Sequence, residues 1–297
     1  MQRPKITIVT PNFNQAGFLE ETILSVIGQN YPDLEYIIVD GGSTDGSIDI
    51  IKKYEKQLAY WVTEPDKGLY HALQKGFERS TGEVMGWINS DDKLHPGSLS
   101  VIAEIFGSLG HVNWITGSPT CYDVNGRTVA AAAHRAWSKY DYYLYDYRWI
   151  QQESTFWRRN LWQKAGATLN LDLRYAADFD LWLRFFRHEK LYSVMTIIGG
   201  FRYRSGQQLS LLHADKYKNE VESLIGAEIA ALPANVRQHL DKYKRYLKRM
   251  AALERANKVF RVFTLTPYFR RKLSDAPGFI EYDPASSRFH IPAEQEN

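Results

Sequence analysis

Short apolar runs alternate with longer amphipathic stretches through the first third of the chain. The short runs are rich in β-branched and aromatic residues and have the length of buried strands; they occupy residues 6–10, 36–39, 60–63 and 84–88. The stretches between them carry apolar side chains at helical spacing, over residues 20–29, 48–54 and 69–79. This alternation predicts an α/β fold with a Rossmann-like, mostly parallel sheet flanked by helices.

Acidic residues stand where the predicted strands end. Asp40 closes the second strand, Asp66 follows the third, and Asp91 and Asp92 follow the fourth. Because ligands of open α/β sheets bind outside the carboxyl ends of the strands, we expect these carboxylates to gather at one binding edge. Paired carboxylates suit a hard cation such as Mg²⁺ or Mn²⁺ that holds phosphate oxygens. The alternative for each single Asp is a turn or a helix cap.

Two common nucleotide-binding motifs do not occur in the sequence. The glycine-rich segment 41–46 lacks the G-x-G-x-x-G spacing of a dinucleotide site, and there is no G-K-[ST] of a P-loop. The single cysteine, Cys121, excludes an internal disulfide and a multi-cysteine metal site. A Rossmann dinucleotide site and a P-loop are therefore poor fits.

Four motifs, in this order, resemble the nucleotide-sugar half of the family-2 glycosyltransferases, which have the GT-A fold. They are TPNFN at 10–14, VDGGSTDG at 39–46, EPDKG at 64–68 and NSDD at 89–92. The resemblance is dense over about residues 4–105 and continues more thinly to about residue 225. It implies a GT-A-like domain over residues 1–230, with the nucleotide-sugar half at 1–105 and the acceptor half at 106–230.

The resemblance assigns donor-binding roles to the residues of these motifs. It makes Phe13 available to stack on the nucleobase and Asp40 an acceptor of a hydrogen bond from the base, while Asp66 borders the nucleoside and the sugar. The full donor-binding set implied in this way is Pro11, Asn12, Phe13, Asp40, Asp66, Lys67, Gly68, Asn89, Ser90 and Asp91. The implied donor is a nucleoside-diphosphate sugar, and family habit favours a UDP-sugar.

The NSDD motif resembles the D-x-D element of the family, which binds a divalent ion and the diphosphate. Asn89 stands in place of the first acid, so the resemblance makes Asp91 the main ligand of Mn²⁺ or Mg²⁺, with Asp92 beside it. Relatives often carry a histidine near the position of Arg204. An arginine cannot ligate a cation, but it can bind diphosphate directly. His213 is the substitute metal ligand that the sequence offers.

Two segments of the second half are expected to serve the acceptor. Residues 150–157 contain Gln152 and Glu153, which either bind acceptor hydroxyls or face solvent on an edge strand. In residues 175–184 the resemblance makes Asp178 the general base and adds Trp182 to the acceptor contacts. The pattern alone makes Asp178 a helix N-cap and places Trp182 on the buried face of that helix.

The chemistry of sugar transfer explains why a carboxylate is expected at Asp178. A sugar hydroxyl is a poor nucleophile, and an acceptor-side carboxylate can take its proton as it attacks the anomeric carbon. On the opposite side, a divalent cation neutralises charge on the leaving nucleoside diphosphate. We therefore expect a metal-dependent inverting glycosyltransferase acting on a glycan or lipid-linked acceptor. The alternative is a degenerate nucleotide-sugar-binding or scaffold protein, because four positions depart from the family pattern: His71, Gln74, Ala177 and Arg204.

Residues 231–297 are expected to form a basic helical extension. Between residues 237 and 272, lysines and arginines greatly outnumber the acids Asp241 and Glu254, and apolar residues recur with roughly helical spacing. Such a helix either lies on an anionic membrane surface or packs on the catalytic domain with a solvated basic face. No base-reading motif accompanies the charge, so nucleic acid is not an expected partner. Residues after Asp275 are expected to be loosely ordered.

The apolar runs are too short for a membrane-spanning helix. None approaches the ~20 residues that a span needs, and the first residues lack the apolar core of a signal peptide. We therefore expect a cytoplasmic protein, or one bound peripherally at the inner face of the cell membrane, where the resemblance implies synthesis of a bacterial surface glycan.

Overall fold

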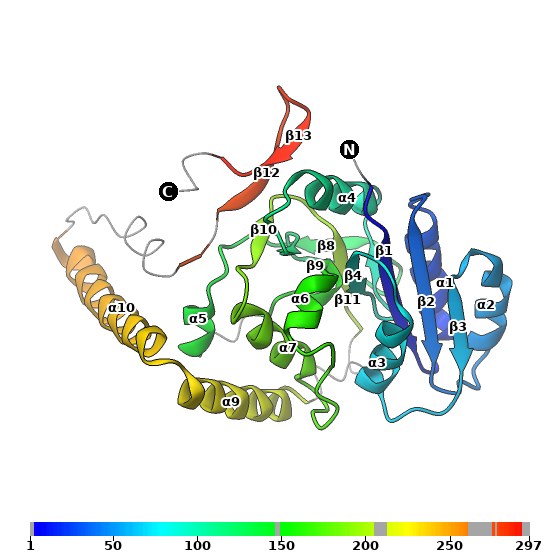
Figure 1. The fold of residues 1–297 in the computed structure, drawn as a ribbon, viewed down its shortest axis with the longest axis horizontal. Helices are drawn as coiled ribbons and strands as arrows, with labels where there is room; N and C mark the ends of the chain where they lie inside the picture. The colour runs from blue at the N-terminus through cyan, green and yellow to red at the C-terminus, as the bar shows by residue number, and fades with distance from the viewer. Residues whose placement is uncertain (1–2, 146–148, 205–212, 261–274, 277, 293–297) are drawn as a thin grey trace.

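The computed structural model describes residues 3–145, 149–204, 213–260, 275–276 and 278–292, with only the helical backbone of residues 253–260. Within these residues the chain forms an α/β fold on a nine-stranded sheet of order β13-β12-β10-β6-β9-β4-β1-β2-β3 (Figure 1). The strands are β1 (Ile6–Asn12), β2 (Leu34–Asp40), β3 (Tyr60–Thr63), β4 (Val84–Trp87), β6 (Trp114–Thr116), β9 (Thr155–Arg158), β10 (Tyr192–Val194), β12 (Phe279–Asp283) and β13 (Arg288–His290).

Most strands of this sheet run in one direction. β1 pairs in parallel with β2 and β4, β2 with β3, and β10 with β6 and β12. Among the described strands of the sheet, β9 and β13 oppose their neighbours. The predicted mostly parallel sheet is confirmed, and its central strands are the buried, Ile- and Val-rich runs that such a sheet needs.

The register of the first three strands aligns their carboxyl ends. Asn12 of β1 lies opposite Asp40 of β2, and Asp40 lies opposite Thr63 of β3. The loops that follow these strands therefore start from one edge of the sheet, as the sequence predicts.

Helices cover both faces of the sheet. α1 (Ala16–Ile27), α2 (Ser47–Lys53) and α4 (Ser98–Ser108) contribute to one apolar cluster, while α3 (Leu69–Arg79), α6 (Arg159–Lys164) and α7 (Ala177–Phe186) contribute to the other. Side chains of β1 alternate between the clusters, since Ile8 belongs to the first and Val9 to the second. The described residues also form the helices η1 (Glu55–Gln57), α5 (Lys139–Tyr143), η2 (Gln152–Ser154), α9 (Ala214–Ala231) and α10 (Ala234–Phe260).

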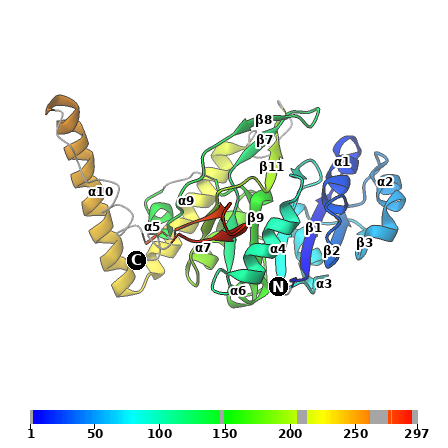
Figure 2. The same ribbon diagram turned by 90° about the horizontal axis from the view of Figure 1, so that it is seen from above.

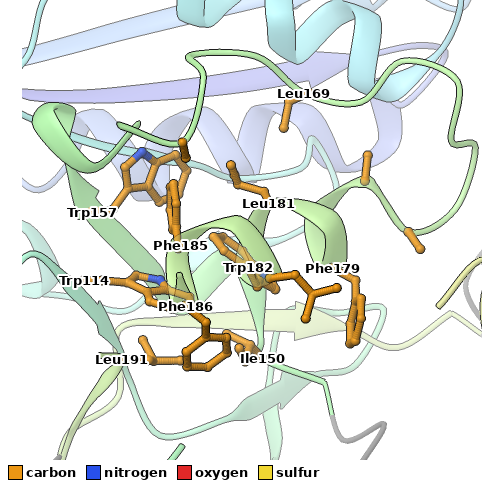
Figure 3. Packing of buried hydrophobic residues seen from close by; sticks show 14 of the residues in the cluster. Trp114, Ile150, Trp157, Leu169, Phe179, Leu181, Trp182, Phe185, Phe186 and Leu191 are labelled. Atoms are coloured by element: carbon orange, nitrogen blue, oxygen red, sulfur yellow. The ribbon is translucent and has the colours of Figure 1, made fainter. Parts of the chain in front are cut away.

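The second cluster has an aromatic centre between the sheet and α7 (Figure 3). The ring of Trp182 stacks on Trp87, with centroids 5.6 Å apart and an interplanar angle of 12°. Trp114 is on β6, and its ring centroid lies 5.6 Å from that of Trp182. The ring of Phe185 contacts the rings of both Trp114 and Trp157. Buried rings of this size contribute roughly 1.5–3 kcal/mol each, so they fix α7 firmly against the sheet.

A second sheet of order β5-β11-β7-β8 supports the loop that follows β4. Its strands are β5 (Lys93–Leu94), β11 (Gly199–Arg202), β7 (Thr120–Tyr122) and β8 (Thr128–Ala131). β7 and β8 form a hairpin, and Gly126 in its turn has the positive φ of 77° that favours glycine. β11 returns along this sheet and brings Arg202 to the residues that follow β4.

The residues after Asp275 differ from expectation. β12 pairs in parallel with β10 and β13 folds back on β12, so both extend the main sheet at the end far from β3 (Figure 1). Ile280 is fully buried, and the N–H of Phe289 donates to Glu104 of α4 at 2.9 Å. The expectations of loose order and of a purely helical extension are therefore wrong here, because these apolar residues cover the open edge of β10.

α10 packs on the body through its first half. Leu240 and Tyr243 are buried, and the hydroxyl of Tyr243 donates to Asp141 of α5 at 2.8 Å. Tyr246 and Leu247 still pack against the body, and the last turns of the helix project from it (Figure 2). The exposed residues of α10 include Lys244 and Lys248. None of the helices in the described ranges is long and apolar enough to cross a membrane.

Candidate active site

Phe13, Gly41 and Asp66 form a cradle at the carboxyl edge of the first three strands. A Cβ atom added to Gly41 would lie 2.8 Å from Asp66 Oδ2 and 3.3 Å from Phe13 Cδ2, so only a glycine fits between the two side chains without displacing them. The Phe13 ring is 59% exposed, and Asp66 accepts a hydrogen bond from the N–H of Gly68 at 2.7 Å. An exposed aromatic face beside a carboxylate and bare backbone suits a flat, hydrogen-bonding base.

Asp40 organises the loop behind this cradle. Its carboxylate accepts hydrogen bonds from Asn12 Nδ2 at 2.6 Å, Thr63 Oγ1 at 2.7 Å, the hydroxyl and N–H of Ser43, and the N–H of Gly42. Burial acts to raise the pKa of Asp40, but these donors outweigh it and hold the pKa below its usual value. Because the side chain is fully buried, a nucleobase can reach Asp40 only if one of the donors gives way.

The remaining expected donor residues divide between surface and interior. Lys67 and Gly68 are exposed beside Asp66, and Gly68, with a φ of 109°, is the N-cap of α3. Pro11 and Asn12 are buried at the end of β1, and Ser90 is buried in the loop after β4. Of this group, Lys67 and Gly68 are the ones that a ligand can contact without rearrangement of the loops.

Asp91 and Asp92 follow the same strand but have different surroundings. Asp92 is buried; its Oδ1 accepts the N–H of Arg202 at 2.7 Å and its Oδ2 accepts the side-chain amide of Asn89 at 3.1 Å. Burial, together with the neighbouring carboxylate of Asp91, raises the pKa of Asp92 well above its usual value. Asp91 is partly exposed, and its Oδ2 forms an ion pair with the guanidinium of Arg204. Only Asp91 therefore presents its carboxylate toward the surface.

Asp91 is suited to hold a divalent cation that arrives with phosphate. No described residue forms a hydrogen bond with its Oδ1, and Mg²⁺ commonly takes one or two carboxylates and completes its shell with phosphate and water. Asp92 supports the loop from the interior, where both of its carboxylate oxygens accept hydrogen bonds, and its role as a ligand stays a prediction. The described residues contain no group of three or more His, Cys, Asp or Glu side chains that could hold a metal, so His213 does not complete a cage. The ring of His213 packs 5.2 Å from Tyr175.

Gln152 and Glu153 lie in η2, and neither faces solvent on an edge strand. Glu153 is 2% exposed; burial raises its pKa to about 8, and the charges of Asp91 and Asp178 act in the same direction. Glu153 is thus within electrostatic reach of both carboxylates. Within the described part of the chain, Glu153 Oε1 and both amide atoms of Gln152 are buried without a hydrogen-bond partner. Such groups cost about 1–3 kcal/mol each when unsatisfied, so they point to a bound ligand or water.

Asp178 lies in the first turn of α7, whose N-cap is Ala176, so the expectation that Asp178 is itself the cap is wrong. Its Oδ1 accepts the N–H of Phe179 at 2.8 Å and lies 3.4 Å from the hydroxyl of Tyr70, which also donates to the Tyr175 carbonyl at 2.9 Å. Burial raises the pKa of Asp178 to about 6, against the lowering effect of these hydrogen bonds. Such a carboxylate is ionised at pH 7 yet basic enough to accept a proton. The contact with Tyr70 has no sequence signal, because 108 positions separate the two residues.

Glu220 of α9 holds the segment that leads into Asp178. Its carboxylate accepts the N–H groups of Arg174 at 3.1 Å, Tyr175 at 3.0 Å and Ala176 at 2.9 Å. These three N–H groups precede Ala177, the first residue of α7, so Glu220 fixes the segment that leads into the helix. Sequence reasoning misses this anchor because nothing near residue 220 signals the contact.

Three further positions have structural explanations. Trp182 is 1% exposed in the aromatic core, so the expected contact between Trp182 and an acceptor is wrong. His71 Nδ1 accepts the N–H of Lys67 at 3.1 Å, just before α3. Gln74 Oε1 accepts the N–H of Leu169 at 2.9 Å and so anchors the loop that precedes α7. The last two departures from the family pattern thus stabilise the loops around the site.

The chain is similar in sequence to known glycosyltransferases. A model of glycosyl transferase family 2 matches residues 7–172, which is more than half of the chain. The putative teichuronic acid biosynthesis glycosyltransferase TuaG of Bacillus subtilis is 37% identical over 94 residues, which cover 31% of this chain and 37% of TuaG. The matched region spans 37–44% of the length of the first curated relatives, which is less than half of each.

Two solved structures show the same fold. The structure of S. aureus TarS 1–349 in complex with UDP-GlcNAc has a TM-score of 0.64 and 19% identity, covering 80% of this chain and 70% of that one. The mannosyltransferase PcManGT from Pyrobaculum calidifontis, in complex with GDP-Man and Mn²⁺, has a TM-score of 0.53 and 16% identity, with coverage of 92% and 85%. The GT-A-like architecture expected from the sequence is thereby confirmed.

Proposed function

This chain belongs to glycosyl transferase family 2, and on that premise we propose that it moves a sugar from a nucleoside-diphosphate sugar to a hydroxyl group of a glycan or lipid-linked acceptor. The observation that carries the proposal is the placement of Asp178. It is a partly exposed carboxylate with a pKa of about 6, held by Tyr70 and by a segment whose backbone N–H groups Glu220 binds. A general base for a sugar hydroxyl needs this combination of basicity and fixed position.

The donor side of the site fits the nucleoside part of the substrate. We assign the base to the exposed ring of Phe13, and the ribose to the neighbourhood of Gly41, Asp66 and Lys67. Two structural neighbours were solved with UDP-GlcNAc and with GDP-Man, which supports a nucleotide sugar but not one particular base. We favour a UDP-sugar.

The diphosphate belongs beside Asp91. When bound there, a divalent cation such as Mn²⁺ or Mg²⁺ neutralises the charge that develops on the leaving nucleoside diphosphate. Asp91 is the residue that would hold it, and the Mn²⁺ in the PcManGT complex supports the use of a divalent cation. Arg204 adds a permanent positive charge at the same place, and a planar guanidinium matches phosphate oxygens well.

The chain supplies the other half of the displacement from the acceptor side. Asp178 accepts the proton of the attacking hydroxyl, and Tyr70, whose pKa burial raises well above its usual value, remains protonated and orients the carboxylate. Gln152 and Glu153 offer unpartnered polar atoms for acceptor hydroxyls. With the base on one side of the anomeric carbon and the diphosphate on the other, attack is in line and the anomeric configuration inverts.

We further propose that the protein works in the cytoplasm, at the inner face of the cell membrane when the acceptor is lipid-linked. The exposed basic residues of α10, such as Lys244 and Lys248, support contact with anionic lipid. The packing of Leu240 and Tyr243 on the body accounts for the first half of α10, so lipid contact concerns the part that projects.

A donor-hydrolysis screen tests the function. The purified protein is incubated with UDP-, GDP- and dTDP-sugars and Mn²⁺, Mg²⁺ or EDTA, and released nucleoside diphosphate is measured. We expect metal-dependent release from one donor, a loss of at least 100-fold in Asp91→Asn and little change in the exposed-loop control Asp172→Asn. Binding of a nucleotide sugar without turnover, even with a panel of acceptors, would favour the degenerate binding protein, and the absence of both would refute the assignment.

A further inference from the structure

Two arginines at the end of β11 approach the Asp91–Asp92 loop, but they bind it differently. Arg202 is fully buried, and its guanidinium donates to the carbonyl oxygens of Asp91 at 2.6 Å and Asp123 at 3.1 Å and to the carboxylate of Glu21. Backbone partners beneath the surface cannot be exchanged without moving the loop. Arg202 therefore has a fixed, structural role.

Arg204 binds the same loop through side chains near the surface. Its guanidinium donates to Gln15 Oε1 at 3.0 Å and pairs with Asp91 Oδ2, and its Cζ atom lies 5.1 Å from the centroid of the Phe18 ring. The side chains of Arg204 and Asp91 are 12% and 15% exposed, so solvent and ligands reach the pair. Side-chain partners at an accessible surface can exchange by rotation alone, without movement of the backbone.

The ion pair conflicts with cation binding at Asp91. A guanidinium on Asp91 Oδ2 occupies one of the two oxygens that a divalent cation would use and places a like charge next to it. Protonation changes cannot relieve the conflict, because an arginine side chain stays charged in proteins. The guanidinium of Arg204 and the divalent cation must therefore either compete for Asp91, or each must have an anionic partner of its own.

A nucleoside diphosphate supplies the second anionic partner. Its phosphate oxygens suit the planar fork of a guanidinium at least as well as a carboxylate does. We propose that Arg204 couples cation binding to nucleotide binding: it pairs with Asp91 before the donor binds and turns to the diphosphate when the donor enters, which frees Asp91 for the cation. This inference rests on the proposed function and adds an order to it, because the cation binds well only together with the nucleotide.

Equilibrium binding of Mn²⁺ tests the coupling without any turnover. Free Mn²⁺ is measured by electron paramagnetic resonance during titration of MnCl₂ into the wild-type protein, with and without UDP, GDP or dTDP. We expect Arg204→Gln to bind Mn²⁺ alone about tenfold more tightly than the wild type and to bind the nucleotide about tenfold more weakly in the presence of Mn²⁺. Arg204→Lys keeps the charge and should gain no affinity for Mn²⁺ alone.

Two controls separate this effect from a general change in charge. Arg127→Gln removes one positive charge from the nearby hairpin, where Arg127 pairs with Asp123 and not with Asp91, and should leave Mn²⁺ binding unchanged. The double variant Arg204→Gln/Asp91→Asn should lose the affinity that Arg204→Gln gained. Thermal melting followed by circular dichroism verifies folding, and Arg204→Met replaces Arg204→Gln if the latter melts early.

The outcomes distinguish a failure of the proposed function from a failure of the coupling by Arg204. A wild-type protein that binds none of the nucleotides with Mn²⁺ overturns the proposed function and this inference with it. A wild-type protein that binds a nucleotide with Mn²⁺, combined with a folded Arg204→Gln variant that gains no affinity for Mn²⁺ alone, overturns the coupling and leaves the function intact.

Discussion

Asp178 is the residue on which the proposed chemistry depends most. Because burial raises its pKa to about 6, the carboxylate is protonated below that pH and can no longer accept a proton from the acceptor. We predict that kcat/KM falls about tenfold per pH unit below pH 6, and that Asp178→Asn lowers transfer by roughly 10²–10⁴-fold at pH 7. A pH–rate profile and the variant's rate check this, with Asp172→Asn as control; an acid limb near pH 4 would show that Asp178 is not the base.

Gly41 is a second residue whose chemistry can be tested alone. Alanine at this position would place its Cβ 2.8 Å from Asp66 Oδ2 and 3.3 Å from Phe13 Cδ2, and so would displace the side chains of the cradle. We predict that Gly41→Ala weakens nucleotide binding about tenfold, as measured by calorimetric titration. Gly110→Ala is the matched control, since a Cβ there meets no atom within 4 Å. Unchanged affinity in Gly41→Ala would place the nucleoside elsewhere.

Among the elements, α9 supports the catalytic site because Glu220 anchors the segment that leads into α7. Hydrogen bonds to a charged group contribute about 1.5–3 kcal/mol each, so we predict that Glu220→Ala lowers the free energy of unfolding by on the order of 2 kcal/mol. The amides of Tyr175 and Ala176 should exchange hydrogen faster, and turnover should fall because Asp178 loses its position. Glu222→Gln, on the same helix, should change neither the stability nor the amide exchange; unchanged amide exchange in Glu220→Ala would refute the anchoring role of Glu220.

Local and periodic features of the fold could be predicted from the sequence, whereas contacts between distant residues could not. Strands, the hairpin at Gly126 and the gathering of Asp66 and Asp91 at one sheet edge are local or periodic properties, and they were predictable. The Glu220 contact, the burial of Trp182 and the addition of β12 and β13 to the sheet depend on residues far apart in sequence. No pattern within a short window carries that information, so family resemblance placed Trp182 at the acceptor incorrectly.

For the whole molecule, Glu35 ties together the amino-terminal edge of the sheet. Its carboxylate accepts hydrogen bonds from Thr7 Oγ1 at 2.6 Å, Thr81 N and Oγ1 at 2.6 Å and Gly82 N at 3.2 Å, and it pairs with Lys5. Burial acts to raise its pKa, but the hydrogen bonds from Lys5, Thr7 and Thr81 lower it to about 2. This edge lies opposite the candidate active site, so the interactions of Glu35 affect the stability of the fold and leave the chemistry unaffected.

Glu35 should make the stability of the fold depend on acid pH. A carboxylate with a depressed pKa contributes stability above its unfolded value of 4.5 and loses it as the pH falls toward 2. The shift corresponds to on the order of 3 kcal/mol, and urea unfolding of wild type and Glu35→Gln between pH 7 and pH 2 measures it. We predict a stability gap that is constant above pH 5 and narrows below pH 4.5. A gap independent of pH would contradict the prediction.

In the proposed mechanism, a base at Asp178 and a leaving diphosphate at Asp91 act on opposite sides of one anomeric carbon. Time-resolved proton NMR of donor hydrolysis tests it directly, because water can replace the unidentified acceptor. The first free sugar formed from an α-linked donor, observed before mutarotation, should be the β anomer. Initial appearance of the α anomer would contradict in-line displacement and, with it, the assignment of Asp178 as the base.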